Sequence, residues 1–445
     1  MTAILSRPVH RLAGTARVPG DKSISHRALM LGGLAVGETF ITGLLEADDV
    51  LATAAAMRNL GASVTRTADG WRVLGRGVGG LTEPARVLDM GNAGTGTRLL
   101  MGIAAAHPFL TFFAGDESLS ARPMARVIAP LTAMGAIIHA RSGGRLPLAV
   151  HGTADLLPIE YRLPVASAQV KSAILLAGLH APGATTVVEP VPSRDHTERL
   201  LAGFGATVAV TATNDGGRRI TLEGQPELMG RAVIVPADPS SAAFPLVAAL
   251  IVPDSRVVLP GIGINPLRAG LIESLVAMGG RIAIENRRIE SGEPVADLIV
   301  ESSPLHAIDV PAARVPAMID EFPILAAAAA CAEGTSRMHG LAELRVKESD
   351  RLDAIVRGLA AAGVSVRSGA DWLEVEGCGG PPPGGGRVEV HFDHRIAMAF
   401  LVLGMACERP LTIDDDRAIA TSFPGFVALM NGLGALLEPV GEAER

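Results

Sequence analysis

A glycine that follows a run of apolar residues recurs six times along the chain at nearly constant intervals. Each glycine stands between an apolar residue and a small one, and neighbouring glycines lie 70 to 84 residues apart. The six are Gly61, Gly135, Gly205, Gly279, Gly363 and Gly434. Glycine just beyond an amphipathic run is the usual residue that ends a helix. The chain is therefore expected to repeat one structural unit six times.

A second feature lies about 40 residues before each glycine, where a polar cluster precedes a run of small and apolar residues. The clusters begin at Asp21, Asn92, Ser167, Ser240, Asp320 and Asp393. The runs are apolar on nearly every side, which predicts buried helices. Short alternating or β-branched stretches between them predict strands. A unit of about 70 residues is too long for a solenoid repeat, so we expect α/β domains of three units each.

The boundary between the two predicted domains is the segment Val235–Pro239. The N-terminal domain is expected to comprise residues 21–236, and the C-terminal domain residues 1–20 together with 237–445. The strand before Pro19 would then pair with the C-terminal domain, and a cleft and a hinge would lie between the domains.

Composition narrows the possible functions. With 39 Lys and Arg against 46 Asp and Glu, the 445-residue chain has a net charge of −7, which argues against a nucleic-acid coat protein. Uncharged runs fall short of the roughly 18 residues of a membrane span, and the N-terminus lacks the apolar core of a secretory leader. The three cysteines are odd in number and far apart, so we expect reduced thiols, a cytoplasmic protein and no metal.

Lysine and arginine recur where the second helix of a unit, or the inner helix, is expected to begin. Helix N-termini bind anions through free N–H groups and the positive end of the dipole. A Ser, Asp or Asn there is also the ordinary N-cap, whereas a basic residue is disfavoured by the dipole and is the better candidate for an anion ligand. The basic residues are Lys22, Arg122, Arg194, Lys347 and Arg395. Their repetition favours an anionic substrate over scattered surface charge.

Carboxylates accompany these basic residues in the C-terminal half of the chain. The acid–base candidates are Asp320, Glu321, Glu348, Asp350, Asp393 and His394. A carboxylate beside Lys347 and Arg351 can form a structural ion pair, or it can carry protons in a reaction. The residue pattern leaves both interpretations open.

Eight motifs together resemble the enolpyruvylshikimate-phosphate synthase family, and in particular its divergent second class. They are GDKSISHR (20–27), GNAGTGTR (91–98), RPM (122–124), ASAQVKSA (166–173), SRDHTE (193–198), DEFP (320–323), LRVKESDR (344–351) and DHRIAM (393–398). The resemblance implies two domains, each of three similar βαβαββ-type units with buried parallel helices, an inside-out α/β barrel. It also implies a monomeric cytoplasmic enzyme that needs no cofactor or metal and binds no nucleic acid or membrane.

The family transfers the enolpyruvyl group of phosphoenolpyruvate to the 5-hydroxyl of shikimate 3-phosphate, a step of aromatic amino-acid biosynthesis. The resemblance implies that Asp320 is the base at the hydroxyl and Glu348 the acid at the methylene carbon, with Lys22 as a third catalytic residue. The residues expected to bind shikimate 3-phosphate are Lys22, Ser23, Arg27, Ser167, Ala168, Gln169, Arg194, Asp320 and Lys347, with Ser193 as a possible helper. Those expected to bind phosphoenolpyruvate are Lys22, Gly94, Arg122, Gln169, Arg351, His394 and Arg395.

Two positions bear on how closely the family pattern is kept. Thr421 stands where many members have a lysine, so this chain lacks one cationic contact that those members offer to phosphoenolpyruvate. Gly94 stands where glyphosate-tolerant members have alanine, and the missing methyl group predicts that this chain is a glyphosate target.

Two other functions are alternatives to this one. Enolpyruvyl transfer to UDP-N-acetylglucosamine commonly uses a loop cysteine as the acid, and no cysteine lies near Arg122. A non-catalytic scaffold that binds anions would need the basic residues but neither Asp320 nor Glu348.

Overall fold

The computed structural model describes residues 2–440, which form two compact units. The N-terminal unit comprises Gly20–Val235 and the short segment Ile289–Glu293. The C-terminal unit comprises the chain up to Pro19, Pro236–Arg288 and the chain from Pro294 onward. The backbone passes from one unit to the other after residues 19, 235, 288 and 293.

The segment Ile289–Glu293 was expected in the C-terminal domain, and the structure places it in the N-terminal unit. Its side chains find polar partners there. Ser291 Oγ accepts a hydrogen bond from the Ile234 amide at 2.8 Å, and Glu293 Oε1 lies 2.8 Å from His196 Nδ1. These contacts join residues far apart in sequence, which no local pattern reveals.

Six four-stranded sheets, three in each unit, reproduce the sixfold repeat. Each has a parallel pair at one edge. In the N-terminal unit the strand orders are β14 (Ala232–Ile234), β3 (Glu38–Thr42), β5 (Gly70–Leu74), β4 (Ser63–Thr67); β6 (Leu88–Asp89), β7 (Leu110–Ala114), β9 (Arg145–His151), β8 (Ile137–Arg141); and β10 (Glu160–Arg162), β11 (Ala184–Glu189), β13 (Arg218–Glu223), β12 (Val208–Ala212). In the C-terminal unit they are β16 (Arg281–Glu290), β17 (Glu293–Glu301), β15 (Arg256–Gly263), β2 (Ala13–Thr15); β18 (Asp309–Val310), β19 (Glu333–His339), β21 (Trp372–Cys378), β20 (Ser365–Ser368); and β22 (Arg387–Val388), β23 (Leu411–Ile413), β1 (Ile4–Arg7), β24 (Leu436–Pro439).

Strands near the start of the chain and at the end of the N-terminal unit complete three of the sheets. Strand β1 pairs with β23 and β24, and β2 pairs with β15, so the first residues of the chain build sheets of the C-terminal unit. Strand β14, the last of the N-terminal unit, pairs with β3, the first strand of that unit. The pairing expected for the strand before Pro19 is thus observed.

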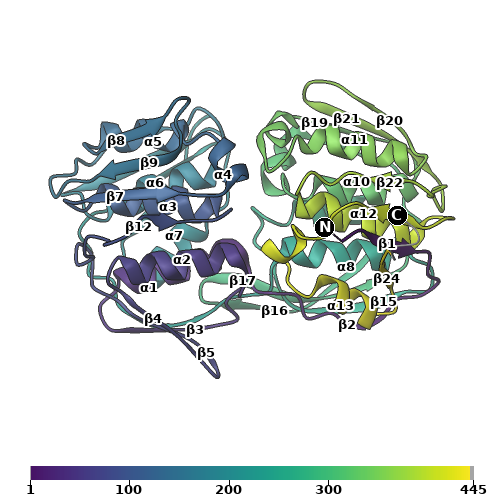
Figure 1. Cartoon of the computed structure of the whole chain (residues 1–445), viewed down its shortest axis with the longest axis horizontal. Coiled ribbons are helices and arrows are strands. Elements are labelled where there is room, and N and C mark those ends of the chain that lie inside the picture. Colours follow the sequence, from purple (N-terminus) through teal and green to yellow (C-terminus); the bar gives the residue numbers. More distant parts are fainter. Residues whose placement is uncertain (1, 441–445) are drawn as a thin grey trace. The chain divides into compact units, whose positions relative to one another are not determined.

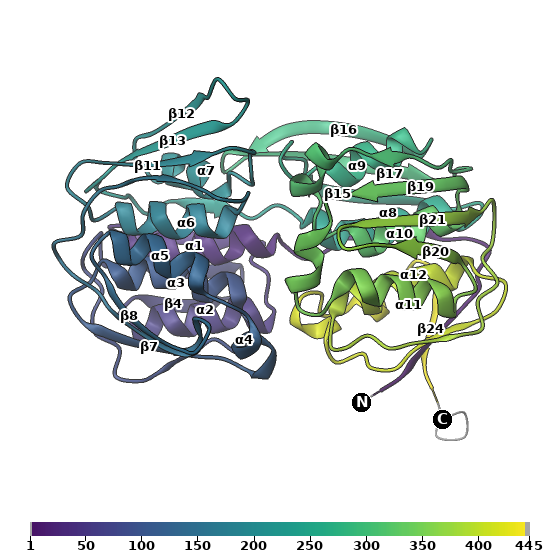
Figure 2. The same cartoon turned by 90° about the horizontal axis from the view of Figure 1, so that it is seen from above.

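Each repeat contributes one inner helix that is buried on nearly all sides, as the apolar runs predict. The inner helices are α1 (Lys22–Leu34), α3 (Gly94–Ala105), α6 (Ala168–Gly178), α8 (Pro239–Ile251), α10 (Phe322–Cys331) and α12 (His394–Ala406). Within each unit the sheets lie outside these helices, so the fold is the expected inside-out α/β architecture (Figures 1 and 2).

Each repeat also contributes an outer helix, buried on one side only. The outer helices are α2 (Asp48–Asn59), α5 (Ala125–Ala133), α7 (His196–Gly203), α9 (Gly270–Ala277), α11 (Arg351–Ala361) and α13 (Phe426–Gly432). The remaining helical segments are α4 (Glu117–Ala121) and the 3₁₀ turns η1 (Ala312–Ala317), η2 (Ala342–Val346) and η3 (Ile419–Thr421).

The six repeat glycines end the outer helices, as predicted. Each follows the residue that caps its helix, and all six have a positive φ, between 76° and 115°. A side chain at such a φ is sterically disfavoured, so glycine is the residue that this turn requires.

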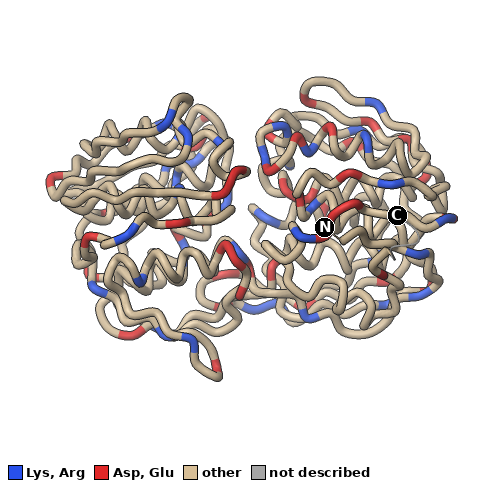
Figure 3. The backbone as a smooth tube through the Cα atoms, in the orientation of Figure 1, with Lys and Arg blue, Asp and Glu red and all other residues tan. Residues whose placement is uncertain are grey.

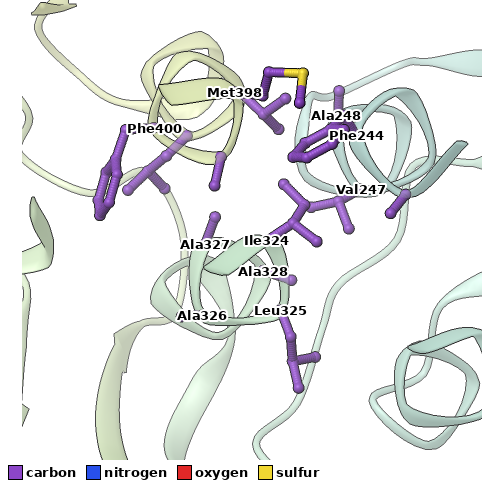
Figure 4. Packing of buried hydrophobic residues seen from close by; sticks show 14 of the residues in the cluster. Phe244, Val247, Ala248, Ile324, Leu325, Ala326, Ala327, Ala328, Met398 and Phe400 are labelled. Carbon is purple, nitrogen blue, oxygen red and sulfur yellow. The ribbon is translucent and has the colours of Figure 1, made fainter. Parts of the chain in front are cut away.

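The core of the C-terminal unit is formed where α8, α10 and α12 pack together. Helices α8 and α10 contain no charged residue, so the backbone tube is tan along both of them in Figure 3. Side chains such as Val247, Ile324 and Met398 lie among one another in the middle of the three helices (Figure 4). The alanines of α10 let its neighbours approach closely. No helix within residues 2–440 has the length and hydropathy needed to cross a membrane.

Several outer helices begin later than the sequence predicted. Arg122 follows α4 instead of starting α5, and Arg194 lies two residues before α7. Lys347 lies four residues before α11, which Asp350 caps by accepting a hydrogen bond from the Asp353 amide at 3.0 Å. These basic residues therefore stand on the loops that enter the helices, where the dipole does not oppose them as it would in the first turn.

Candidate functional site

In the N-terminal unit, polar side chains connect the starts of the inner helices. Ser167 caps α6, and its Oγ accepts a hydrogen bond from the Val170 amide at 3.4 Å. Gln169 Nε2 donates to Thr95 Oγ1 at 3.0 Å, and Gln169 Oε1 accepts from Arg98 Nη1 at 3.1 Å. The starts of α3 and α6, both predicted to contact substrate, are therefore adjacent.

Arg27 is a buried guanidinium that joins three helices. Its Nε donates to Thr197 Oγ1 and its Nη2 to Ser172 Oγ, both at 2.7 Å. Its Nη1 donates to the Ser23 carbonyl at 2.9 Å. Burial lowers the pKa of Arg27 to about 10, so it remains a cation at neutral pH beneath the start of α1.

Arg122, on the loop between α4 and α5, lies beside the GNAGTGTR motif. Its Nη2 donates to Asn92 Oδ1 at 2.5 Å and to Ser118 Oγ at 3.0 Å. Gly94 begins α3 against the same guanidinium. A β-carbon built on Gly94 would lie 3.1 Å from Arg122 Nη1 and 3.0 Å from Arg98 Nη1, so a methyl group there would press on two cations.

The other predicted residues of the N-terminal unit lie at helix starts or on an adjacent loop. Lys22 is the first residue of α1 and forms an ion pair with Asp49 of α2. Arg194 is half-buried on the loop between β11 and α7. Beside it, the buried hydroxyl of Ser193 donates to Glu189 Oε1.

In the C-terminal unit, both predicted acid–base residues belong to one ionic cluster. Asp320 Oδ1 lies 3.1 Å from Lys347 Nζ and 3.2 Å from Arg351 Nη1. Glu348 Oε2 accepts from Arg351 Nη2. Asp393 Oδ2 accepts from Arg351 Nε at 2.8 Å. Each of the three guanidinium nitrogens of Arg351 thus donates to a different carboxylate.

The centre of the cluster is almost completely buried. The side chain of Arg351 is 1% exposed and that of Asp393 is fully buried. Burial opposes the charged form of Asp393, but the Arg351 guanidinium outweighs it and the pKa of Asp393 is lowered. Burial likewise disfavours the Arg351 cation, yet the charges of Asp393, Glu348 and Asp320 raise the pKa of Arg351 above its ordinary value. A substrate anion that binds Arg351 would compete with these carboxylates for the guanidinium.

Arg395 and His394 begin α12 beside this cluster. Arg395 Nη1 donates to the Asp320 carbonyl at 3.1 Å and to Glu321 Oε1 at 3.2 Å. His394 is buried at the first position of the helix. Glu321 is buried as well and accepts from Ser240 Oγ at the start of α8. The starts of α8, α10 and α12 therefore meet, as the starts of α3 and α6 do in the other unit.

Thr421 occupies the position where many family members have lysine. It is the last residue of η3, and its hydroxyl donates to the Ala418 carbonyl at 2.7 Å. The structure thus gives Thr421 a local role in closing the turn.

Sequence reasoning did not single out several polar residues that the structure places beside the predicted ones. Arg98 is part of the quoted GNAGTGTR motif, but it carried no role there. Arg268, which contacts Ser240 Oγ at 2.6 Å, and Lys171, which is fully buried in α6, were also missed. Lys171 is part of the quoted motif ASAQVKSA, and as the one charged residue of α6 it could have been noticed. Within residues 2–440, no three His, Cys, Asp or Glu side chains are grouped so that they could hold a metal ion.

Comparison with known sequences gives a consistent answer along nearly the whole chain. The model of the family described as EPSP synthase (3-phosphoshikimate 1-carboxyvinyltransferase) matches residues 6–430. The 3-phosphoshikimate 1-carboxyvinyltransferase of Paramagnetospirillum magneticum is 65% identical over 431 residues, with 97% of each chain covered. That of Granulibacter bethesdensis is 63% identical over 430 residues, covering 96% of this chain and 93% of the relative.

Comparison with solved structures agrees. An EPSP synthase structure from Acinetobacter baumannii superposes with a TM-score of 0.88 at 45% identity, covering 99% of this chain and all of the other. The enolpyruvyl transferase NikO from Streptomyces tendae has a TM-score of 0.78 at 18% identity, with 99% of each chain covered. The latter likeness shows the fold alone.

Proposed function

Because the chain belongs to the EPSP synthase family, we propose a division of its catalytic work among the residues described above. The reaction is the transfer of the enolpyruvyl group of phosphoenolpyruvate to the 5-hydroxyl of shikimate 3-phosphate, with release of phosphate. The relatives support neither transfer to UDP-N-acetylglucosamine nor a non-catalytic scaffold. The observation that carries the proposal is the cluster in which Asp320 and Glu348 share Arg351.

Shikimate 3-phosphate is proposed to bind first of all through Ser167, Gln169 and Arg194. The phosphate takes the Ser167 hydroxyl and the Arg194 guanidinium, a cation that suits a phosphate because it can donate two hydrogen bonds at once. The ring hydroxyls and carboxylate take Ser23 and Arg27. Lys22, Ala168, Asp320 and Lys347 are proposed as further ligands of shikimate 3-phosphate.

Phosphoenolpyruvate is proposed to bind mainly through basic residues. Arg122, beside Gly94, is one main ligand, together with Lys22 and Gln169. Arg351, His394 and Arg395 are the other proposed ligands. Several cations are needed because the two substrates together carry several negative charges.

The acid is proposed to act first, at the methylene carbon of the enolpyruvyl group, and the base then acts at the 5-hydroxyl that attacks the neighbouring carbon. Glu348 gives its proton to the methylene carbon, which leaves cationic character at the neighbouring carbon. The 5-hydroxyl attacks that carbon while Asp320 takes the hydroxyl proton. The tetrahedral intermediate then loses phosphate, and the Glu348 carboxylate takes back a proton from the new methyl group, which restores the double bond.

Glu348 is the carboxylate that phosphoenolpyruvate is proposed to displace from Arg351. Its side chain is 24% exposed, against 13% for Asp320 and none for Asp393. The displaced carboxyl group would then be free of its contact with Arg351 Nη2. Substrate binding then prepares the acid for the next step.

The test of the proposed binding roles compares two arginine variants. Arg194→Gln is expected to raise KM for shikimate 3-phosphate about tenfold or more, since a charge-assisted hydrogen bond is lost. KM for phosphoenolpyruvate should change by less than about threefold. Arg395→Gln should show the opposite pattern. Equal changes in both constants for either variant would contradict the assignment.

Gly94→Ala tests the proposal that glyphosate inhibits this enzyme at the phosphoenolpyruvate site. The added methyl group would meet Nη1 of Arg122 at 3.1 Å, which leaves less room for glyphosate. We expect the concentration of glyphosate for half inhibition to rise about tenfold or more, together with a smaller rise in KM for phosphoenolpyruvate. Gly432→Ala is the control, because a β-carbon there has nothing within 4 Å. Inhibition that is the same for wild type and Gly94→Ala would count against the proposal.

We also propose that the protein works in the cytoplasm as a monomer, on small-molecule substrates and without a nucleic-acid or membrane partner. The free thiols of Cys331, Cys378 and Cys407 support a reducing compartment. The net charge of −7 argues against nucleic acid.

A further inference from the structure

Lys171 is a fully buried cation with three polar partners. It is the fourth residue of α6, and its Nζ is 2.9 Å from Glu189 Oε2 and 2.7 Å from Glu198 Oε1. It also donates to the Ser193 carbonyl at 3.3 Å. An ammonium group has three hydrogens to donate, so these contacts account for all of them. None of the roles described above uses this side chain.

The partners of Lys171 frame the loop that bears Arg194. Glu189 is the last residue of β11, immediately before the loop, and Glu198 is the third residue of α7, just after it. Ser193, next to Arg194, is held twice, through its carbonyl by Lys171 and through its hydroxyl by Glu189. The loop is therefore fixed at both ends and beside Arg194, against the helix that Ser167 begins.

The charge of the cluster matters because a phosphate is expected beside it. Two ionised glutamates around one lysine would leave a net negative charge. Burial raises the pKa of Glu198, although Lys171 opposes this in part. Its second oxygen, Oε2, is buried and accepts no hydrogen bond from the residues that the structure describes. Removing Lys171 would therefore leave the Glu189 carboxylate buried without its cation, beside the place where the phosphate is expected.

We propose that Lys171 is a positioning residue for shikimate 3-phosphate, which holds Ser193 and Arg194 against the start of α6. The inference rests on the proposed function of Arg194 and Ser167 as ligands of the 3-phosphate. Lys171 itself touches no substrate.

The test is the effect of Lys171→Met on the two Michaelis constants. The variant lacks the clamp and leaves the Glu189 charge without its partner. We expect KM for shikimate 3-phosphate to rise about tenfold or more, with KM for phosphoenolpyruvate and kcat at saturation within about threefold of wild type. In Lys171→Met/Glu189→Gln the uncompensated charge is gone, so KM for shikimate 3-phosphate should recover by about threefold or more relative to Lys171→Met. Absence of this recovery would overturn the charge argument.

Two further variants separate positioning from a general loss of stability. Leu176→Ala removes a buried apolar side chain on the same helix, five residues beyond Lys171, so it should lower stability and leave both Michaelis constants unchanged. If Lys171→Met fails to fold, Glu189→Gln alone serves, because it keeps the shape and removes the charge that holds Lys171. It should raise KM for shikimate 3-phosphate about threefold or more, and no rise would overturn the inference.

Arg194→Gln distinguishes failure of this inference from failure of the proposed function. If Arg194→Gln raises KM for shikimate 3-phosphate and Lys171→Met does not, the role of Lys171 is wrong and the phosphate site stands. If Arg194→Gln has no effect on this constant, the phosphate site is wrong, and the inference about Lys171 falls with it.

Discussion

Replacing Glu348 by glutamine is expected to lower kcat about 10²- to 10⁴-fold, the range typical of losing a general acid. Glutamine has nearly the same shape and can still accept from Arg351 Nη2, as Glu348 does. It has no acidic proton to give to the methylene carbon, so the loss falls on the chemical step. Both Michaelis constants should stay within about threefold of wild type. Steady-state assays of phosphate release, at saturating concentrations of both substrates, measure the effect.

Asp353→Asn is the matched control for this variant. Asp353 lies in the first turn of α11, and its half-exposed carboxylate pairs with Arg357 at 3.0 Å. Losing this surface carboxylate should leave kcat unchanged. A kcat for Glu348→Gln that is close to that of the control would rule out Glu348 as the acid.

Arg351→Met is expected to destabilise the C-terminal unit by about 3–5 kcal/mol, the usual cost of removing one partner from a buried ionic cluster. The variant leaves Asp393 fully buried without its cation and deprives Asp320 of a contact at 3.2 Å. Urea unfolding followed by circular dichroism measures the change. Arg357→Met, on the same helix but 52% exposed, is the control and should cost less than about 1 kcal/mol.

A second substitution tests the electrostatic origin of that loss. In Arg351→Met/Asp393→Asn the uncompensated charge is removed. Asp393 caps α12 by accepting a hydrogen bond from the Arg395 amide at 3.0 Å, and asparagine can still accept it. The double variant should therefore be more stable than the sum of the two single effects predicts, by about 1 kcal/mol or more. Additive effects would mean that Arg351 stabilises the unit by packing alone.

The fold could be predicted because its signals are local. Each repeat glycine, such as Gly61, directly follows the helix that it ends, and its positive φ is a property of that one residue. The buried inner helices are legible for the same reason, since an apolar run such as Phe322–Cys331 needs no knowledge of distant residues. Because both signals recur six times, they predict the number of repeats.

The site was harder to predict because its contacts join distant segments. The carboxylates of Asp320 and Asp393 are 31 and 42 residues from Arg351, so their common contact leaves no spacing pattern. Lys171 and its partner Glu189 are 18 residues apart and belong to a helix and a strand. Arg122 was expected at a helix start, but the structure shows it on the loop before α5. Motif resemblance identified the segments, and the structure was needed to show what each side chain contacts.

The central claim is that this chain transfers an enolpyruvyl group to shikimate 3-phosphate. Its most direct test is phosphate release from phosphoenolpyruvate by the purified protein, measured with shikimate 3-phosphate, with UDP-N-acetylglucosamine and with no acceptor. The account predicts release only when shikimate 3-phosphate is present. Release that depends on UDP-N-acetylglucosamine, or no release from folded protein with either acceptor, would contradict it.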